Sequence, residues 1–181
     1  MNTFLPTIAI MTAVQTWMKA AVLTPASAPN PAVNLVEDCQ FYSSPDLVRA
    51  FQELKSFKNR ICLIIPSYDH YQETREGNSL KIHCVRQFTL LLCDRDVGNR
   101  QKASTGDPAD PAHPGVLAMK DYVENNLIAL NFDFLPALLV LHPLEGQPFK
   151  LVDKDRTDLA GRLGWLMTWQ ADAGDRVFTI R

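Results

Sequence analysis

The sequence of 181 residues lacks the short motifs that accompany common enzyme chemistries. It contains no GxGxxG or GxxxxGK[ST] segment for a nucleotide, no HExxH pair for a metal and no GxSxG elbow for a nucleophilic serine. It also lacks an excess of one charge, because 18 Lys and Arg stand against 20 Asp and Glu. That balance argues against a dedicated nucleic-acid-binding domain, which would be basic. We therefore expect neither an enzyme nor a cofactor.

Cysteine is scarce, and its spacing is irregular. No two of the four cysteines, at Cys39, Cys62, Cys84 and Cys93, form a CxxC pair. This spacing weakens a zinc or redox interpretation. Because three of them lie in apolar runs, we expect buried thiols outside any disulfide, as in a protein of a reducing compartment.

Long uninterrupted apolar runs are also missing. The segment Phe4–Leu23 is mostly apolar, but Pro6, Gln15 and Lys19 interrupt it, and no basic region precedes it. We expect neither a signal peptide nor a membrane span. Apolar residues recur there at helical spacing, at Ile10, Val14, Trp17 and Ala21. This pattern predicts an amphipathic helix over 7–21 that docks on the protein or on a neighbouring subunit.

The middle of the chain predicts a helix and a buried strand. Ser44, Pro45 and Asp46 form a helix start, and the helix is expected to end near Phe57. The apolar run Ile61–Ile65 predicts a strand buried on both faces and stopped by Pro66. The polar segment 67–79 is expected to be a loop, and 34–42 a short strand.

A long alternating segment follows at 80–93, where Arg86 interrupts the apolar face. Fourteen residues of strand would span about 46 Å at roughly 3.3 Å per residue, far beyond the usual length. The strand is therefore expected either to bend at a bulge near Arg86 or to project beyond the domain.

The second half predicts one long irregular segment, one helix and further strands. The irregular segment covers 94–115 and the helix covers 116–130. Strands are expected at 137–142, 149–152 and 159–169, with a turn at 145–148 and a tail from 171.

Together these elements predict an α+β fold, with a mixed, mainly antiparallel sheet packed against about three helices and with long projecting loops or a hairpin. We expect one domain over 1–181. An N-terminal helix and proline-rich linker cover 1–33, the core covers 34–173, and a C-terminal tail covers 174–181.

Candidate contact residues gather in the predicted loops. Tyr68, His70 and Tyr71 follow a buried strand, and aromatic side chains on such a loop offer rigid contact area at a small entropic cost. The alternative is partial packing onto the domain. Further candidate contacts with a subunit or partner are Arg86, Arg100, Lys102 and His113.

One catalytic alternative stays open. Asp94 and Asp96 end the long strand, where carboxylates can hold Mg²⁺ in a metal-dependent hydrolase or nuclease. Asp153 is a further candidate for that site. No Glu-x-Lys companion follows on the next predicted strand, which favours a polar strand end instead.

The order of elements resembles the tail terminator, or tail completion, proteins of long-tailed bacteriophages. The likeness covers about Asp38 to Ala173. The residues that carry it are Pro45-Asp46-Leu47-Val48-x-x-Phe51, Ile61-Cys62-Leu63-Ile64-Ile65-Pro66, Phe88-Thr89-Leu90-Leu91-Leu92-Cys93-Asp94-Arg95-Asp96 and the strand from Trp165 to Trp169.

The resemblance implies a non-enzymatic virion protein, assembled in the cytoplasm of the host bacterium. Such proteins form a ring, typically hexameric, on the head-proximal end of the tail tube. The ring stops tube polymerisation and meets the head-tail connector, while DNA passes through its lumen without specific binding. The alternatives are a generic protein-binding module that presents Tyr68 and Tyr71, or the hydrolase above.

Overall fold

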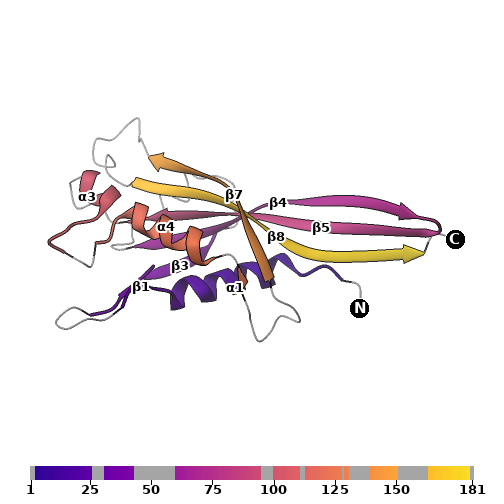
Figure 1. Cartoon of the computed structure of the whole chain (residues 1–181), viewed down its shortest axis with the longest axis horizontal. Helices are drawn as coiled ribbons and strands as arrows, with labels where there is room; N and C mark the ends of the chain where they lie inside the picture. Colours follow the sequence, from indigo (N-terminus) through magenta and orange to yellow (C-terminus); the bar gives the residue numbers. More distant parts are fainter. Residues whose placement is uncertain are drawn as a thin grey trace.

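The computed structural model describes residues 3–25, 31–42, 60–94, 100–110, 113–127, 129–130, 139–150 and 163–179. In this part of the chain a six-stranded sheet with the strand order β3-β4-β5-β8-β7-β6 forms the scaffold (Figure 1). β3 runs parallel to β4, and the other neighbouring strands are antiparallel. The predicted α+β class with a mixed, mainly antiparallel sheet is therefore confirmed.

The strands differ greatly in length. The sheet consists of β3 (Asp38–Phe41), β4 (Ile61–Glu76), β5 (Ser79–Cys93), β6 (Ala129–Leu130), β7 (Leu139–Lys150) and β8 (Leu163–Thr179). A separate small sheet pairs β1 (Val22–Thr24) with β2 (Val33–Asn34). The core therefore depends on three long strands, β4, β5 and β8.

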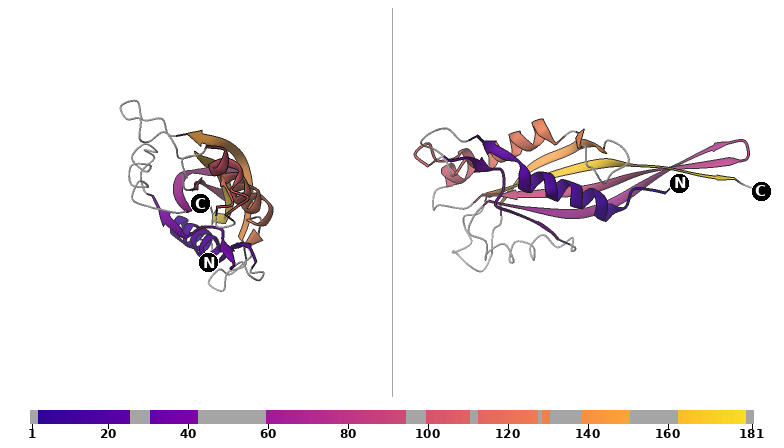
Figure 2. Two further views of the ribbon diagram at one scale, coloured as in Figure 1. Left: turned by 90° about the vertical axis from the view of Figure 1, so that its left-hand side faces the viewer. Right: turned by 90° about the horizontal axis from the view of Figure 1, so that it is seen from below.

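Two helices cover one face of this sheet, which we call the inner face (Figure 2). They are α1 (Thr7–Ala20) and α4 (Val116–Asn126), and a short helix, α3 (Arg100–Thr105), precedes α4. The ring centroids of Trp17 in α1 and Tyr122 in α4 lie 6.1 Å apart. Both helices bury their apolar faces against the same cluster of sheet residues, which includes Phe88 and Trp169.

The helix predicted over 7–21 is confirmed. Ile10 and Val14 are buried in the core, so α1 packs on its own subunit, although Ile8 remains exposed. Ala21 closes the helix, where its N–H donates to the carbonyl of Trp17. Among the described residues, no helix combines the length and the apolar character needed to cross a membrane.

The run Ile61–Ile65 is buried on both faces, as predicted. Cys62 and Ile64 join the inner core under α1, while Ile61, Leu63 and Ile65 are buried on the opposite, outer face. Alternate residues of a strand point to opposite faces, so a continuous apolar run is needed where both faces are covered.

The loop predicted at 67–79 is wrong. β4 continues through Pro66 to Glu76, and residues 69–76 pair with β5 in regular register. A register shift between Pro66 and Asp69 accommodates the missing N–H of the proline. Gly77, with φ +59°, forms the turn that leads into β5. The segment is polar because it extends beyond the core as a hairpin, not because it is irregular.

The 80–93 strand both bends and projects. The ladder with β8 shifts between His83 and Val85, and the ladder with β4 shifts between Pro66 and Asp69. These two bulges flank Arg86, which pairs with Asp69 and Ala171. Beyond them, β4, β5 and β8 leave the body together (Figure 1).

Several boundaries in the second half require correction. β7 runs through Pro143 and the predicted turn at 145–148, because a register shift between Pro143 and Glu145 absorbs the proline. β8 continues to Thr179, so the tail predicted from 171 and the tail boundary at 174 are wrong over the described residues. Within 94–115 the chain forms α3, and α4 ends at Asn126 instead of 130. The helix predicted from Ser44 lies outside the described residues, as does the start of the 159–169 strand.

Candidate functional site: a projecting arm

We call residues 67–76 of β4, 79–85 of β5 and 172–179 of β8 the arm. Figure 1 shows the arm leaving the body at the end opposite α3, with β5 between β4 and β8. Paired residues on neighbouring strands point to the same face. The arm therefore has an inner face continuous with the face that α1 covers, and an outer face continuous with the other side.

Arg86 lies at the root of the arm, which is the point where its three strands leave the body. Its guanidinium donates from Nε to the carbonyl of Leu5 over 2.8 Å and from Nη1 to the Thr7 hydroxyl over 2.7 Å. It also forms an ion pair with Asp69, and its side chain is only 14% exposed. The amide of Leu5 donates to the carbonyl of Ala173. One side chain thus joins the segment before α1 to both strands of the hairpin.

The inner face of the arm carries apolar side chains beside charged ones. Tyr71, Leu80, Ile82 and Phe178 lie on it, as the register with the buried Cys84 and with Arg86 requires. Tyr71 is 52% exposed and Phe178 is 38% exposed. The body covers this face with helices, but over the arm much of it remains accessible.

The N-terminal segment covers the base of that face. The ring of Phe4 lies 5.8 Å from the ring of Tyr71 and 5.6 Å from the guanidinium of Arg176. The same guanidinium lies 5.0 Å from the ring of Phe178, so Arg176 makes cation–π contacts with two rings. The hydroxyl of Tyr71 donates to Asp69, and this hydrogen bond raises the pKa of Tyr71.

The outer face of the arm is polar. Asp175 accepts hydrogen bonds from Lys81 over 2.8 Å and from His83 over 2.9 Å, and these bonds tie β8 to β5. The bond with Lys81, followed by that with His83, lowers the pKa of Asp175. The same carboxylate raises the pKa of Lys81. Exposed pairs of this kind stabilise little, at most about 1 kcal/mol each, so the arm is held mainly by its strand ladders.

The predicted contact residues do not form one surface. Tyr68, His70 and Tyr71 are exposed on the arm, although on a strand instead of a loop. Arg86 is committed to contacts inside the subunit. The other expected contacts, Arg100, Lys102 and His113, lie at the opposite end of the molecule, around α3.

At that end the charged side chains pair locally. Lys102 donates to Asp107 over 2.5 Å, and this bond lowers the pKa of Asp107. The imidazole of His113 lies 3.5 Å from Asp110 and 4.0 Å from Asp94. These contacts fold the segment back on itself between α3 and α4.

Asp94 occupies a structural position. Its side chain is 1% exposed, and it accepts a hydrogen bond of 3.0 Å from the amide of Gly115, just before α4. Asp96 and Asp153 lie outside the described residues. Within the described ranges, no group of three His, Cys, Asp or Glu side chains is arranged to hold a metal ion.

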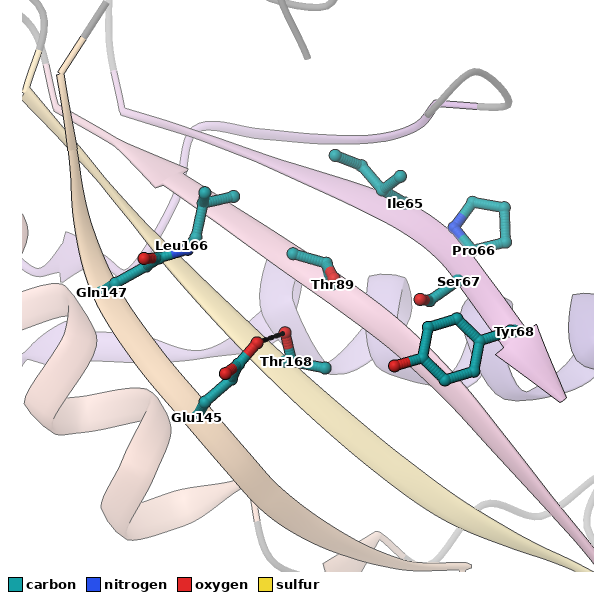
Figure 3. Close-up of a pocket in the computed structure, with 9 residues that line it drawn as sticks. All are labelled: Ile65, Pro66, Ser67, Tyr68, Thr89, Glu145, Gln147, Leu166 and Thr168. Atoms are coloured by element: carbon teal, nitrogen blue, oxygen red, sulfur yellow. Dashed lines mark hydrogen bonds between the residues drawn. The ribbon is translucent and has the colours of Figure 1, made fainter. Parts of the chain in front are cut away.

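A groove of about 400 Å³ lies on the outer face of the sheet (Figure 3). Its lining comes from four strands and comprises Ile65, Pro66, Ser67, Tyr68, Thr89, Glu145, Gln147, Leu166 and Thr168. Tyr68 is 65% exposed at one end. The Thr168 hydroxyl donates to Glu145 over 3.5 Å, and Glu145 is the charged member of the lining. The groove can hold a polar or aromatic side chain.

All four cysteines fall within the described residues, where they are buried and form no disulfide, as predicted. Burial raises the pKa of Cys62 well above its ordinary value and also raises that of Cys84. A thiol held in its neutral form is a poor nucleophile, so these residues act as small core side chains.

Local sequence patterns do not reveal most of the arm. They place Phe4 in the N-terminal helix region, and Arg176 and Phe178 in a tail. The available signal was the alternation of Val177, Phe178 and Thr179, which matches the period of two in Ser79–Ile82 across the ladder. That short pattern indicates a strand only when residues 177–179 are known to pair with residues 79–81.

No protein-family model matches this chain, and a comparison with curated protein sequences finds no match. The likeness to tail terminators thus rests on the order of elements alone.

Proposed function

We propose that this chain is a structural subunit that assembles with copies of itself, through its arm, into a closed ring. In keeping with the resemblance above, the ring would sit at the head-proximal end of a phage tail tube, end tube growth and join the tail to the head connector. The observation that carries the proposal is the arm itself: three strands that leave the core and expose apolar side chains, among them Tyr71 and Phe178.

An arm of this kind needs a partner. β3 pairs with β4 only over Ile61–Ile64, and β7 pairs with β8 only as far as Ala171. Among the described residues, the outer edges of both strands therefore have no strand partner along the arm. Unpaired edges and exposed apolar side chains favour association with another chain.

The shape of the subunit favours a ring over a two-fold dimer. The two edges of the arm, β4 and β8, are different surfaces, so a contact that joins the β4 edge of one copy to the β8 edge of the next is heterologous. Such heterologous contacts close into rings when the rotation between copies closes. The net charge of −2 suits a lumen through which DNA passes without specific binding.

The proposal is tested on the full chain by mass photometry and negative-stain microscopy, followed by addition to polymerising tail tubes. We expect a ring whose mass is a whole multiple of 20.3 kDa, together with shorter tubes when the protein is present. A protein that stays monomeric at tens of micromolar and leaves tube length unchanged contradicts it. A ring that does not cap tubes leaves the assembly role standing and removes the tail assignment.

A second candidate is a protein-binding module centred on the outer-face groove. The exposure of Tyr68 beside a groove of about 400 Å³ favours it. This candidate predicts a discrete complex with one partner and no self-assembly. Glu145→Ala, in the groove but outside the arm, would then weaken partner binding, whereas it would leave the mass of a ring formed through the arm unchanged.

A further inference from the structure

The two outer edges of the arm lie on opposite sides of β5 and run in the same direction. β4 and β8 are each antiparallel to β5, so they are parallel to each other. A second copy related by rotation about an axis along the arm would therefore bring its β4 beside the β8 of the first copy, as a parallel pair. This geometry requires that no strand of the described part pairs with the outer edge of β4 beyond Ile64 or with that of β8 beyond Ala171. At the root of the arm, the Leu5 amide donates to the Ala173 carbonyl, so the free length of β8 begins after Ala173.

The printed register shows which side chains would meet. Glu73, Ile82 and Arg176 form one row across the arm, and Arg75, Leu80 and Phe178 form another. Both rows lie on the inner face. If the strands run along the rotation axis, a rotated copy would continue the row, so that Arg176 of one copy would lie beside Glu73 of the next.

The same register gives complementary contacts in the second row. Phe178 of one copy would lie beside Arg75 of the next, which allows a cation–π contact. In the described part of the subunit, neither Glu73 nor Arg75 forms an ion pair, and Arg176 meets aromatic rings instead of a carboxylate. The first row thus ends in opposite charges, with Glu73 at the β4 edge and Arg176 at the β8 edge.

The outer face repeats this complementarity at the root of the arm. His70, Val85 and Asp172 form one row, so Asp172 of one copy would lie beside His70 of the next. The bulge between His83 and Val85 turns Asp172 to the outer face while Arg176 stays on the inner face. In these two rows, the β8 edge carries Asp172 on the outer face and Arg176 on the inner face, while the β4 edge carries His70 on the outer face and Glu73 on the inner face. Within its own subunit, Asp172 accepts from the Gly174 amide over 2.7 Å and lies 3.9 Å from His83.

From this relationship we propose that β8 of one subunit pairs with β4 of the next, in parallel register, so that the arms of neighbouring copies form one continuous sheet. The partner is a second copy of this chain. The inference rests on the self-assembly proposed above and specifies the contact that carries it. Edge-to-edge addition supplies main-chain hydrogen bonds for affinity, and the charged rows fix the register.

Charge reversal provides one test. Glu73→Arg places two arginines together and Arg176→Glu places two acids together, so each is expected to weaken assembly about tenfold or more. The double variant restores an opposite pair and is expected to return to within about threefold of wild type. Asp121→Arg, an exposed change on α4, serves as the matched control and is expected to have no effect.

Disulfide trapping provides a second test. It does not depend on the charge-reversal variants, so it remains informative if they are unstable. Within one subunit, Glu73 and Arg176 are separated by β5, roughly 10 Å apart, which is too far for a disulfide. A mixture of Glu73→Cys and Arg176→Cys chains is therefore expected to give crosslinked dimers upon mild oxidation. The control pairs Glu73→Cys with Val177→Cys, because Val177 points to the other face and is expected not to crosslink.

The outcomes separate the two proposals. A wild-type chain that is monomeric at all concentrations overturns the proposed function and this inference with it. A wild-type ring that the reversals leave unchanged, without the 73–176 crosslink, overturns this inference and leaves the ring standing. Crosslinking of Glu73→Cys chains to one another alone indicates a two-fold β4–β4 contact and also overturns it.

Discussion

The guanidinium of Arg86 donates from Nε to the carbonyl of Leu5 over 2.8 Å, across a separation of 81 residues. This bond fastens the segment before α1 to the central strand of the arm. Because Leu5 also bonds to Ala173 on β8, the N-terminus and all three strands meet at the root. Arg86 therefore links the N-terminal segment to the strands at the point where the arm leaves the body.

We expect Arg86→Met to lower the free energy of unfolding by about 2–3 kcal/mol, because the carboxylate of Asp69 loses its charged partner and the Leu5 carbonyl loses its donor. Urea unfolding measures the loss. Lys19→Met is the control, since the Lys19–Asp38 pair is half exposed at 3.7 Å and should change stability by less than about 0.5 kcal/mol. Equal losses in the two variants would contradict a special role for Arg86.

Gly115 is expected to tolerate no side chain. Its φ is +82°, and a Cβ there would lie 2.3 Å from the backbone nitrogen of Gly106. Gly115→Ala should therefore prevent folding or destabilise the chain by more than about 3 kcal/mol. Gly77→Ala is the matched control: its φ is also positive, but nothing lies within 4 Å of the added Cβ. That control should lose about 1 kcal/mol, and comparable melting temperatures for the two variants would show that crowding at Gly115 is unimportant.

Asp94→Ala is expected to reduce stability, by about 2–3 kcal/mol, because it leaves the amide of Gly115 without its buried acceptor. Asp94→Asn retains an acceptor oxygen and should lose less. Thermal unfolding of both variants measures the difference. Calorimetric titration with Mg²⁺ or Mn²⁺ checks the alternative, since metal binding that disappears in Asp94→Asn would revive a hydrolase site.

The arm should be most firmly paired at intermediate pH. The pKa of Asp175 is lowered in the folded state, so its contribution is present above the ordinary pKa of about 4 and is lost as pH falls through the folded value. The pKa of Lys81 is raised, so its contribution is present below about 10.5 and is lost as pH rises through the folded value. The protection factor of the Val177 amide, which corrects for the intrinsic pH dependence of exchange, should therefore fall at both extremes. Asp175→Asn should remove the change seen at low pH. If that change persists in the variant, the Lys81–Asp175 pair does not cause it.

Local patterns predicted the body of the fold well. Helical spacing located α1 within one residue at its end, and the continuous apolar run at Ile61–Ile65 correctly indicated a strand buried on both faces. In both segments the apolar residues are close together in the sequence, so the pattern can be recognised without knowing which distant segment packs against them. The position of Trp169 in the core follows from the same alternation.

The arm could not be predicted in the same way. Residues 67–76 and 172–179 are mostly polar and exposed. Pro66 indicates the end of a strand, because a proline is tolerated within a strand only at an edge or beside a bulge, as here. Their strand structure comes from pairing across the ladder with β5, which is a long-range property. Residues 67–79 were therefore predicted as a loop, and residues 174–179 as a tail.

The most direct measurement is the native mass of the full chain at several concentrations. The account predicts one closed species at a whole multiple of 20.3 kDa, which Glu73→Arg shifts toward monomer and Glu73→Arg with Arg176→Glu restores. A single peak at 20.3 kDa throughout the micromolar range would contradict it.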